Sequence, residues 1–235
     1  MRSFLYAGLA SICISGCVST THLDNSTADG KKVIVVGEQA WQAQSAKAYK
    51  KLINQMKKSR TVVIDPKLQR LMDQMLPHTS VYHPDSSEWQ WEINAQLSGV
   101  LNASSFAGGK ILVNTGMYWQ LQLSDDELAF VIAHEMAHAL LDHRRKKVAA
   151  SLFLGSLPTY LSHGVSQTWL HESEADILAL ELMQDAGMNP QAASTFFEKF
   201  QRETERRRQL KADQPLMSGE FMDYRRQIIS EALAS

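Results

Sequence analysis

The sequence predicts an α+β fold that is mostly helical and carries a small β-sheet. Two observations lead to this prediction. Segments of helical periodicity occupy most of the chain from residue 40 onward, including a strongly apolar helix that starts at Ser124. Between residues 88 and 114 the pattern changes to two short stretches rich in Trp, Ile and Val, as strands are. A chain of 235 residues is long enough to bury one substantial core.

The composition excludes several classes of protein. With 44% hydrophobic and 21% charged residues, the chain has an ordinary globular composition. Its formal net charge of −1 argues against a nucleic-acid-binding protein, which normally carries a basic surplus, so we expect no nucleic-acid partner. Its two cysteines are too few for a disulfide-rich scaffold.

The first sixteen residues have the pattern of a secretory signal peptide. Arg2 precedes an apolar stretch of residues 4–14, which is too short to span a bilayer. The stretch ends in Ser15-Gly16-Cys17, which resembles the bacterial lipobox, whose cysteine is acylated and becomes the mature N-terminus. We therefore predict a signal peptide over residues 1–16 and a lipid anchor at Cys17. A plain signal peptide cut elsewhere, or a short buried helix, is the alternative.

The next segment predicts how the anchor joins the rest of the chain. Residues 17–38 are rich in Ser, Thr, Asp and Gly, which is typical of a flexible tether, and one domain is expected over residues 39–235. Val18 stands where lipoproteins of the inner membrane usually carry Asp. This residue favours the periplasmic face of the outer membrane as the location.

The expected elements of the domain follow in order. Ala40 to Lys58 has helical spacing, and Pro66 to Leu76 is a second helix with Pro at its first turn. Glu88 to Val100 alternates as a strand does. A Gly-Gly turn then leads into a second strand, Lys110 to Asn114, and the pattern is helical after Gly116.

The helix that starts at Ser124 carries the first chemical motif. Ser124 and Glu127 form a capping box, which marks the start of the helix. His134 and His138 are four residues apart, so they project from one face and can converge on one Zn²⁺. Glu135 lies one position around from His134, where it can act as the general base on a water without ligating the metal.

A catalytic zinc needs a third protein ligand, and a downstream helical segment offers two carboxylates. Glu172 and Asp176 share one face, so that one can bind the metal and the other can accept the spare N–H of a ligand histidine. Glu174 lies roughly 200° around the helix from Glu172 and should point away. His143 is expected to cap the end of the preceding helix or to contact its dipole.

These residues together resemble a known family. The motif His134-Glu135-Met136-Ala137-His138, followed by Glu172-Ser173-Glu174-Ala175-Asp176, resembles the gluzincin metallopeptidases related to HtpX and the CAAX prenyl protease, nearest to the small periplasmic YggG-like or LoiP-like lipoproteins. Asn102-Ala103 and Gly108-Gly109-Lys110 are similar to another segment of that family. The resemblance implies a zincin-like domain with an active-site helix and one Zn²⁺ per chain. It also implies Glu172 as the third ligand and Asp176 as the residue that orients His134.

The expected function is that of a zinc-dependent endopeptidase of the bacterial cell envelope. It would use zinc-activated water to hydrolyse unfolded or misassembled proteins, as a form of protein quality control. Two alternatives stay open: a chaperone-like assembly module with a zinc site, and a metal-dependent hydrolase of a non-peptide envelope substrate.

Two further expectations concern the substrate. The strand of Lys110, Ile111, Leu112, Val113 and Asn114 should present an edge to extended periplasmic proteins or peptides. An oxyanion-stabilising residue is also expected. The candidates are Tyr160, His163, His171, Tyr224 and Arg225.

Overall fold

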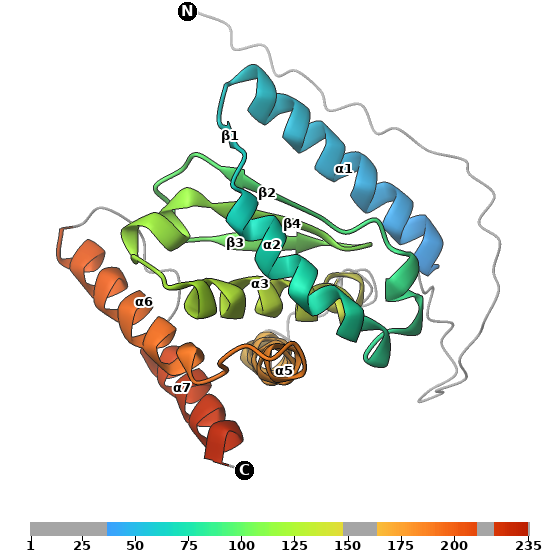
Figure 1. The fold of residues 1–235 in the computed structure, drawn as a ribbon. Coiled ribbons are helices and arrows are strands. Elements are labelled where there is room, and N and C mark those ends of the chain that lie inside the picture. Colours follow the sequence, from blue (N-terminus) through green and yellow to red (C-terminus); the bar gives the residue numbers. More distant parts are fainter. Residues whose placement is uncertain (1–36, 148–163, 211–218, 235) are drawn as a thin grey trace, which may run out of the picture.

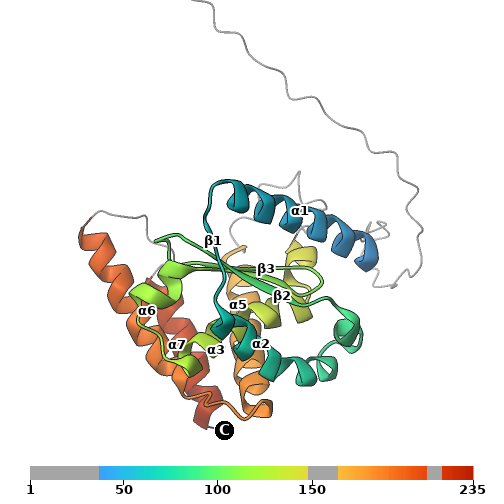
Figure 2. The ribbon, with the colours of Figure 1, turned by 45° about the horizontal axis from the view of Figure 1, so that its top comes forward.

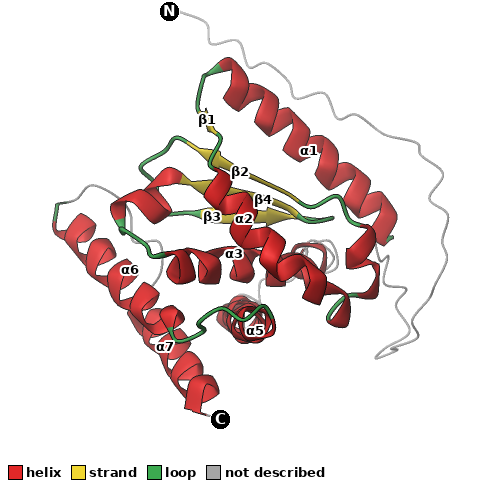
Figure 3. Cartoon of the chain, viewed as in Figure 1, coloured by secondary structure: helices red, strands yellow, loops and turns green. Residues whose placement is uncertain are grey.

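The computed structural model describes residues 37–147, 164–210 and 219–234. In this part of the chain helices surround one small sheet, as Figures 1 and 3 show, and the predicted α+β, mostly helical fold is confirmed. The helices are α1 (Glu38–Lys58), α2 (Pro66–Met75), α3 (Asp125–Leu140), α5 (Gly164–Asp185), α6 (Ala192–Gln209) and α7 (Gly219–Ala234). The strands are β1 (Val62–Val63), β2 (Glu92–Gln96), β3 (Ala103–Phe106) and β4 (Lys110–Asn114). Two 3₁₀ turns (Leu76–Val81 and Pro84–Glu88) and a π-helical turn (Gly116–Gln120) lie between them.

The sheet corrects one prediction about the substrate-binding strand. Its strand order is β1-β2-β4-β3, so β4 pairs with β2 in parallel on one side and with β3 antiparallel on the other. The prediction that Lys110, Ile111, Leu112, Val113 and Asn114 form an edge is therefore wrong. The continuous apolar run of Ile111, Leu112 and Val113 belongs to an interior strand that is buried on both faces. The edge beside α3 is formed by β3.

Both faces of the sheet are covered by helices. Successive side chains of a strand point to opposite faces, and β4 uses this alternation to join two cores. Ile111 and Val113 belong to the core that includes α2 and α3, whereas Leu112 packs with Tyr49 and Ile53 of α1. Figure 2 shows the resulting order, with α1 above the sheet and α2, α3 and α5 beneath it.

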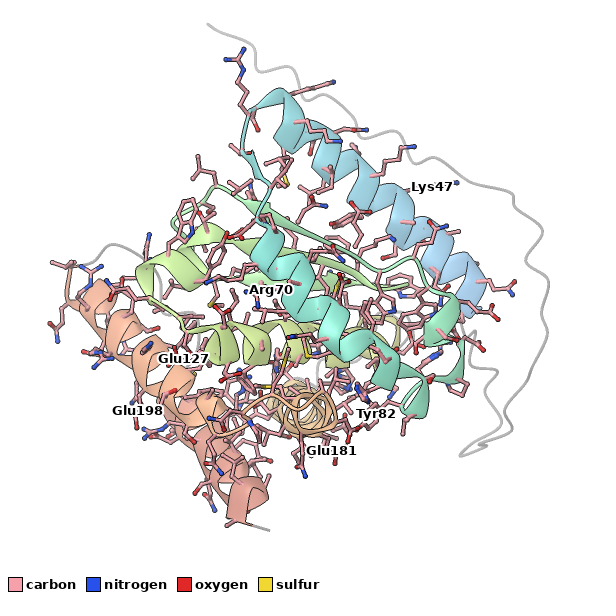
Figure 4. The ribbon with its side chains drawn as sticks, in the orientation of Figure 1. Lys47, Arg70, Tyr82, Glu127, Glu181 and Glu198 are labelled. Carbon is pink, nitrogen blue, oxygen red and sulfur yellow. The ribbon has the colours of Figure 1, made fainter. Side chains whose placement is uncertain are left out.

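Helix α3 is buried almost throughout, and its start is held by several polar contacts. The Ser124 Oγ accepts the backbone N–H of Glu127, while the Glu127 carboxylate accepts the backbone N–H of Ser124, which is the predicted capping box. The same carboxylate is 2.6 Å from Nζ of Lys199 on α6, and Figure 4 shows Glu127 facing that helix. The cap therefore ties the start of α3 to α6. Among the described residues, no helix combines the length and apolarity that crossing a bilayer requires.

Most of the predicted elements are present, with shifted ends. The helices expected over residues 40–58 and 66–76 are α1 and α2, and Asp65 caps α2 by accepting the N–H of Lys67. The strand expected over residues 88–100 is shorter, because a 3₁₀ turn precedes it and the chain leaves the sheet at Gln96. The predicted signal peptide (1–16), the tether (17–38) up to residue 36, and Cys17 lie outside the described residues.

Candidate metal centre

The centre forms where α3 and α5 pack side by side. Small residues lie at this contact: Ala137 on α3 and Ala175 on α5 belong to one cluster and are completely buried. Their short side chains allow the two helices to approach closely, which brings polar groups of both helices together. Helix α3 provides His134 and His138, and α5 provides Glu172. Figure 2 shows these two helices beneath the sheet.

The three donor groups are spaced as the ligands of a tetrahedral metal are. The Nε2 atoms of His134 and His138 are 3.0 Å apart. Glu172 places Oε2 3.3 Å from Nε2 of His134 and Oε1 3.4 Å from Nε2 of His138. Ligands that are held 2.0–2.1 Å from a tetrahedral zinc lie roughly 3.3 Å from one another. The donor set and its spacing therefore fit a zinc ion.

A buried ion pair supports the first histidine from behind. Asp176 Oδ1 lies 2.9 Å from Nδ1 of His134, and both Asp176 oxygens accept hydrogen bonds from Arg225 of α7, at 2.6 and 2.7 Å. Arg225 Nη1 also lies 3.4 Å from Oε2 of Glu172. Two acidic side chains of α5 thus share one buried cation.

The charges of this group set its protonation. Burial alone would raise the pKa of Asp176, but the charge and hydrogen bonds of Arg225 outweigh burial and hold that pKa below its usual range. Burial likewise opposes ionisation of Glu172, yet hydrogen bonds from His134 and His138 lower its pKa. Burial favours the neutral ring of His134, but its contacts with Asp176 and Glu172 raise its pKa. These contacts therefore favour the charged ring of His134.

Glu135 lies in the wall of a cavity that opens onto the three donors. The cavity has a volume of about 730 Å³ and is lined by His134, Glu135, His138 and Glu172. Phe196, Phe197 and Phe200 of α6 also line it, so that one part of the cavity is apolar. Glu135 is itself buried, which places a carboxylate beside the donor set but outside it.

The edge strand β3 forms another wall of the cavity. Asn114 donates its backbone N–H to Asn102 O. Residues of an antiparallel strand alternate in whether their backbone N–H and C=O groups face the partner strand. Ser104 and Phe106 therefore direct these groups toward β4. Ala103 and Ser105 consequently carry their N–H and C=O groups on the side away from β4. All residues of β3 line the cavity. The sequence pattern did not identify this edge, because the substrate-binding edge was expected at β4.

His143 and Glu174 belong to the centre in a way that helical spacing did not predict. His143 Nδ1 lies 2.9 Å from Nδ1 of His138, and His143 Nε2 lies 3.0 Å from Oε2 of Glu174. The ring of His143 also stacks on His171 at 4.4 Å. Burial, together with the charges of His138 and His171, lowers the pKa of His143 to about 3, so this ring is neutral. Glu174, which we expected to point away from the centre, instead contacts it, because its carboxylate lies against His143.

The five residues considered as oxyanion stabilisers lie in different environments. Arg225 pairs with Asp176, and His171 stacks on His143. Tyr224 packs its ring 5.4 Å from that of Trp169. Tyr160 and His163 lie outside the described residues. Of the three described candidates, Arg225 and His171 line the cavity.

The donor set, two histidines on one helix and a glutamate on the next, is one that catalytic zinc sites of metallopeptidases use. Comparison with known proteins agrees. Residues 64–169, which include the His134–His138 motif, match the family model "Peptidase family M48". This match agrees with the resemblance drawn from the first motif, and that family implies a divalent metal ion.

The relatives found by sequence carry the names of proteases. The chain is 30% identical over 160 residues to the mitochondrial metalloendopeptidase OMA1 of Schizosaccharomyces pombe, which covers 54% of this chain and 46% of the relative. It is 25% identical over 176 residues to the beta-barrel assembly-enhancing protease of Escherichia coli, which covers 63% of this chain and 35% of the relative. The chain thus spans less than half the length of these curated relatives.

The buried ion pair predicts a large loss of stability when one partner is removed. Asp176→Asn removes the closest of the counter-charges of buried Arg225 and leaves the more distant Glu172 carboxylate, so the free energy of unfolding should fall by about 3 kcal/mol at pH 7. Urea unfolding with a metal chelator measures this change. Because the pKa of Asp176 is lowered in the folded state, the effect should be full above about pH 4 and fade as the pH falls through the folded pKa.

The matched control is Glu205→Gln, which breaks the exposed ion pair between Glu205 and Arg208. This change should cost less than about 1 kcal/mol, because exposed pairs are screened by water. Equal losses in the two variants would contradict the assigned role of Asp176.

Proposed function

We propose that this chain is a zinc-dependent endopeptidase that cleaves extended segments of unfolded or misassembled proteins. One observation carries the proposal: Nε2 of His134, Nε2 of His138 and the Glu172 carboxylate lie 3.0–3.4 Å apart, beside Glu135, in a cavity with a strand edge as one wall. A purely structural zinc site needs neither an extra carboxylate nor a cavity. The match of residues 64–169 to the model "Peptidase family M48" supports the same class of reaction.

Zinc, when bound by His134, His138 and Glu172, supplies Lewis-acid chemistry that polarises the scissile carbonyl and makes water more acidic. Glu135 takes the proton of the attacking water and delivers it to the leaving nitrogen. Asp176 holds the ring of His134 through Nδ1, and Arg225 balances the charge of Asp176. The aromatic side chains of α6 keep that part of the cavity apolar, where an apolar substrate side chain can bury surface.

The substrate backbone binds along β3 in this proposal. Ala103 and Ser105 direct backbone N–H and C=O groups away from β4, and an extended peptide can add to such an edge through main-chain hydrogen bonds. Binding of this kind requires an extended stretch of substrate. It therefore selects unfolded or loop segments over folded surfaces.

Replacement of Glu135 tests the reaction. Glu135→Gln should retain one zinc per chain, measured by elemental analysis, and should lower the rate of cleavage of an unfolded protein by about 10²–10⁴-fold, as the loss of a general base does. Glu172→Gln should instead lose zinc affinity.

Glu198→Gln makes the same chemical change on the exposed surface of α6 and should alter neither quantity. If the wild-type chain binds zinc and envelope proteins but shows no cleavage that depends on Glu135, the chaperone-like alternative replaces the proposal.

Backbone methylation of a peptide substrate tests the role of β3. Residues of a bound strand turn alternate N–H groups toward β3, so N-methylation at every second residue should lower kcat/KM by about tenfold, because a methyl group removes one hydrogen bond and crowds the edge. Methylation of the intervening residues is the internal control and should have little effect. If N-methylation lowers kcat/KM equally at successive positions of the peptide, binding along β3 is contradicted.

We also propose that the chain acts at the periplasmic face of the outer membrane, attached through Cys17. The support is the lipobox-like end of the first sixteen residues and the Val that follows it. Several acyl chains hold a protein on a membrane without a spanning helix. Mass spectrometry of the mature N-terminus should find an acylated Cys17, and an unmodified cysteine there would remove this part of the proposal. A Cys17→Ala variant, which should stay unacylated, is the control.

A further inference from the structure

The second histidine of the centre is held by a buried residue that follows the end of α3. The helix ends at Leu140, and Asp142 then adopts a left-handed backbone conformation with φ 56°. Asp tolerates this conformation better than most residues. The turn directs His143 back under the helix, where its side chain is 4% exposed and its Nδ1 meets Nδ1 of His138.

Hydrogen-bond accounting leaves one arrangement of protons for these groups. A neutral imidazole has one N–H and one acceptor nitrogen. If Nε2 of His138 is to donate its lone pair to a metal, its proton must be on Nδ1. His143 must then accept with Nδ1 and carry its own proton on Nε2, which lies 3.0 Å from the Glu174 carboxylate, an acceptor. Each group thus has the role that its neighbour requires.

We infer that Glu174 and His143 form a relay that positions His138 as a metal ligand and fixes its tautomer. This inference rests on the proposed zinc site. It makes the support of the two histidine ligands parallel: Asp176 contacts His134 directly, whereas Glu174 reaches His138 through His143. The three acidic residues alternate along one stretch of α5, and each serves a different part of the same centre.

A separate cation site at His143, His171 and Glu174 explains the same cluster less well. These three residues offer donor atoms within 4.8 Å of one another. However, the rings of His143 and His171 are stacked, with 14° between their planes and 4.4 Å between their centroids. The lone pairs of stacked imidazoles lie in separate, nearly parallel planes, so they cannot converge on one ion. A cation site of this kind also does not account for the contact between Nδ1 of His143 and Nδ1 of His138.

Zinc affinity of the full chain, measured by competition with a chelator, tests the relay. His143→Phe keeps an aromatic ring but removes both nitrogens, and it should weaken zinc binding by about 10–100-fold, as the loss of a residue that orients a metal ligand does. Glu174→Ala should weaken binding less, because water can reach this half-exposed carboxylate position. In the His143→Phe background Glu174→Ala should have no further effect, because the two residues act in series.

Two measurements separate positioning from mere packing. His143→Asn places an amide oxygen near the position of Nδ1, so it should recover part of the lost affinity. Nitrogen-15 NMR of the zinc-loaded wild-type chain should find the proton of His138 on Nδ1 and that of His143 on Nε2. This measurement also decides the matter if His143→Phe does not fold.

The outcomes distinguish this inference from the function on which it rests. If the wild-type chain binds no zinc, the proposed function fails and takes the relay with it. If the wild-type chain binds zinc while His143→Phe and Glu174→Ala bind within twofold of it, the relay alone is overturned. A proton on Nδ1 of zinc-loaded His143, or independent effects that multiply in the double variant, would overturn it as well.

Discussion

The close contact between α3 and α5 is the constraint on which the rest of the structure depends. Fully buried small residues such as Ala137 and Ala175 allow the two helices to approach, and this approach places histidines of one helix opposite carboxylates of the other. Polar groups in such a dry contact are costly unless each has a partner. The surrounding elements supply those partners: Arg225 from α7 contacts Asp176, and His143 from the segment after α3 contacts His138.

The centre is consequently built from long-range contacts around a short local motif. His134, Glu135 and His138 come from little more than one helical turn, but Glu172 and Asp176 arrive from α5 and Arg225 from α7. The sheet contributes differently, because its edge strand β3 lies along the cavity while β4, buried on both faces, anchors β3 to the two cores. The donor atoms and the strand edge that lines the cavity are thus held by separate parts of the fold.

Local patterns in the sequence predicted what depends on local physics. The capping box at Ser124 and the proline at the start of α2 mark helix starts that the structure reproduces. The four-residue spacing of His134 and His138 was sufficient to place both on one face. In contrast, the edge of the sheet depends on which strands pair, and Lys110–Asn114 carries no local signal that distinguishes an interior strand from an edge. The contact of His143 with His138 was missed because it depends on the left-handed turn at Asp142, which helical projection does not include.

The position of Arg225 late in the sequence determines when the candidate metal centre can be completed during folding. Arg225 lies on α7, the last described helix, yet it provides the buried positive charge beside Asp176 and Glu172. A growing chain therefore reaches the residues of α3 and α5 well before it reaches their counter-charge. The candidate metal centre can assume its final electrostatic balance only after α7 has docked, so completion of the fold and completion of the centre are one event.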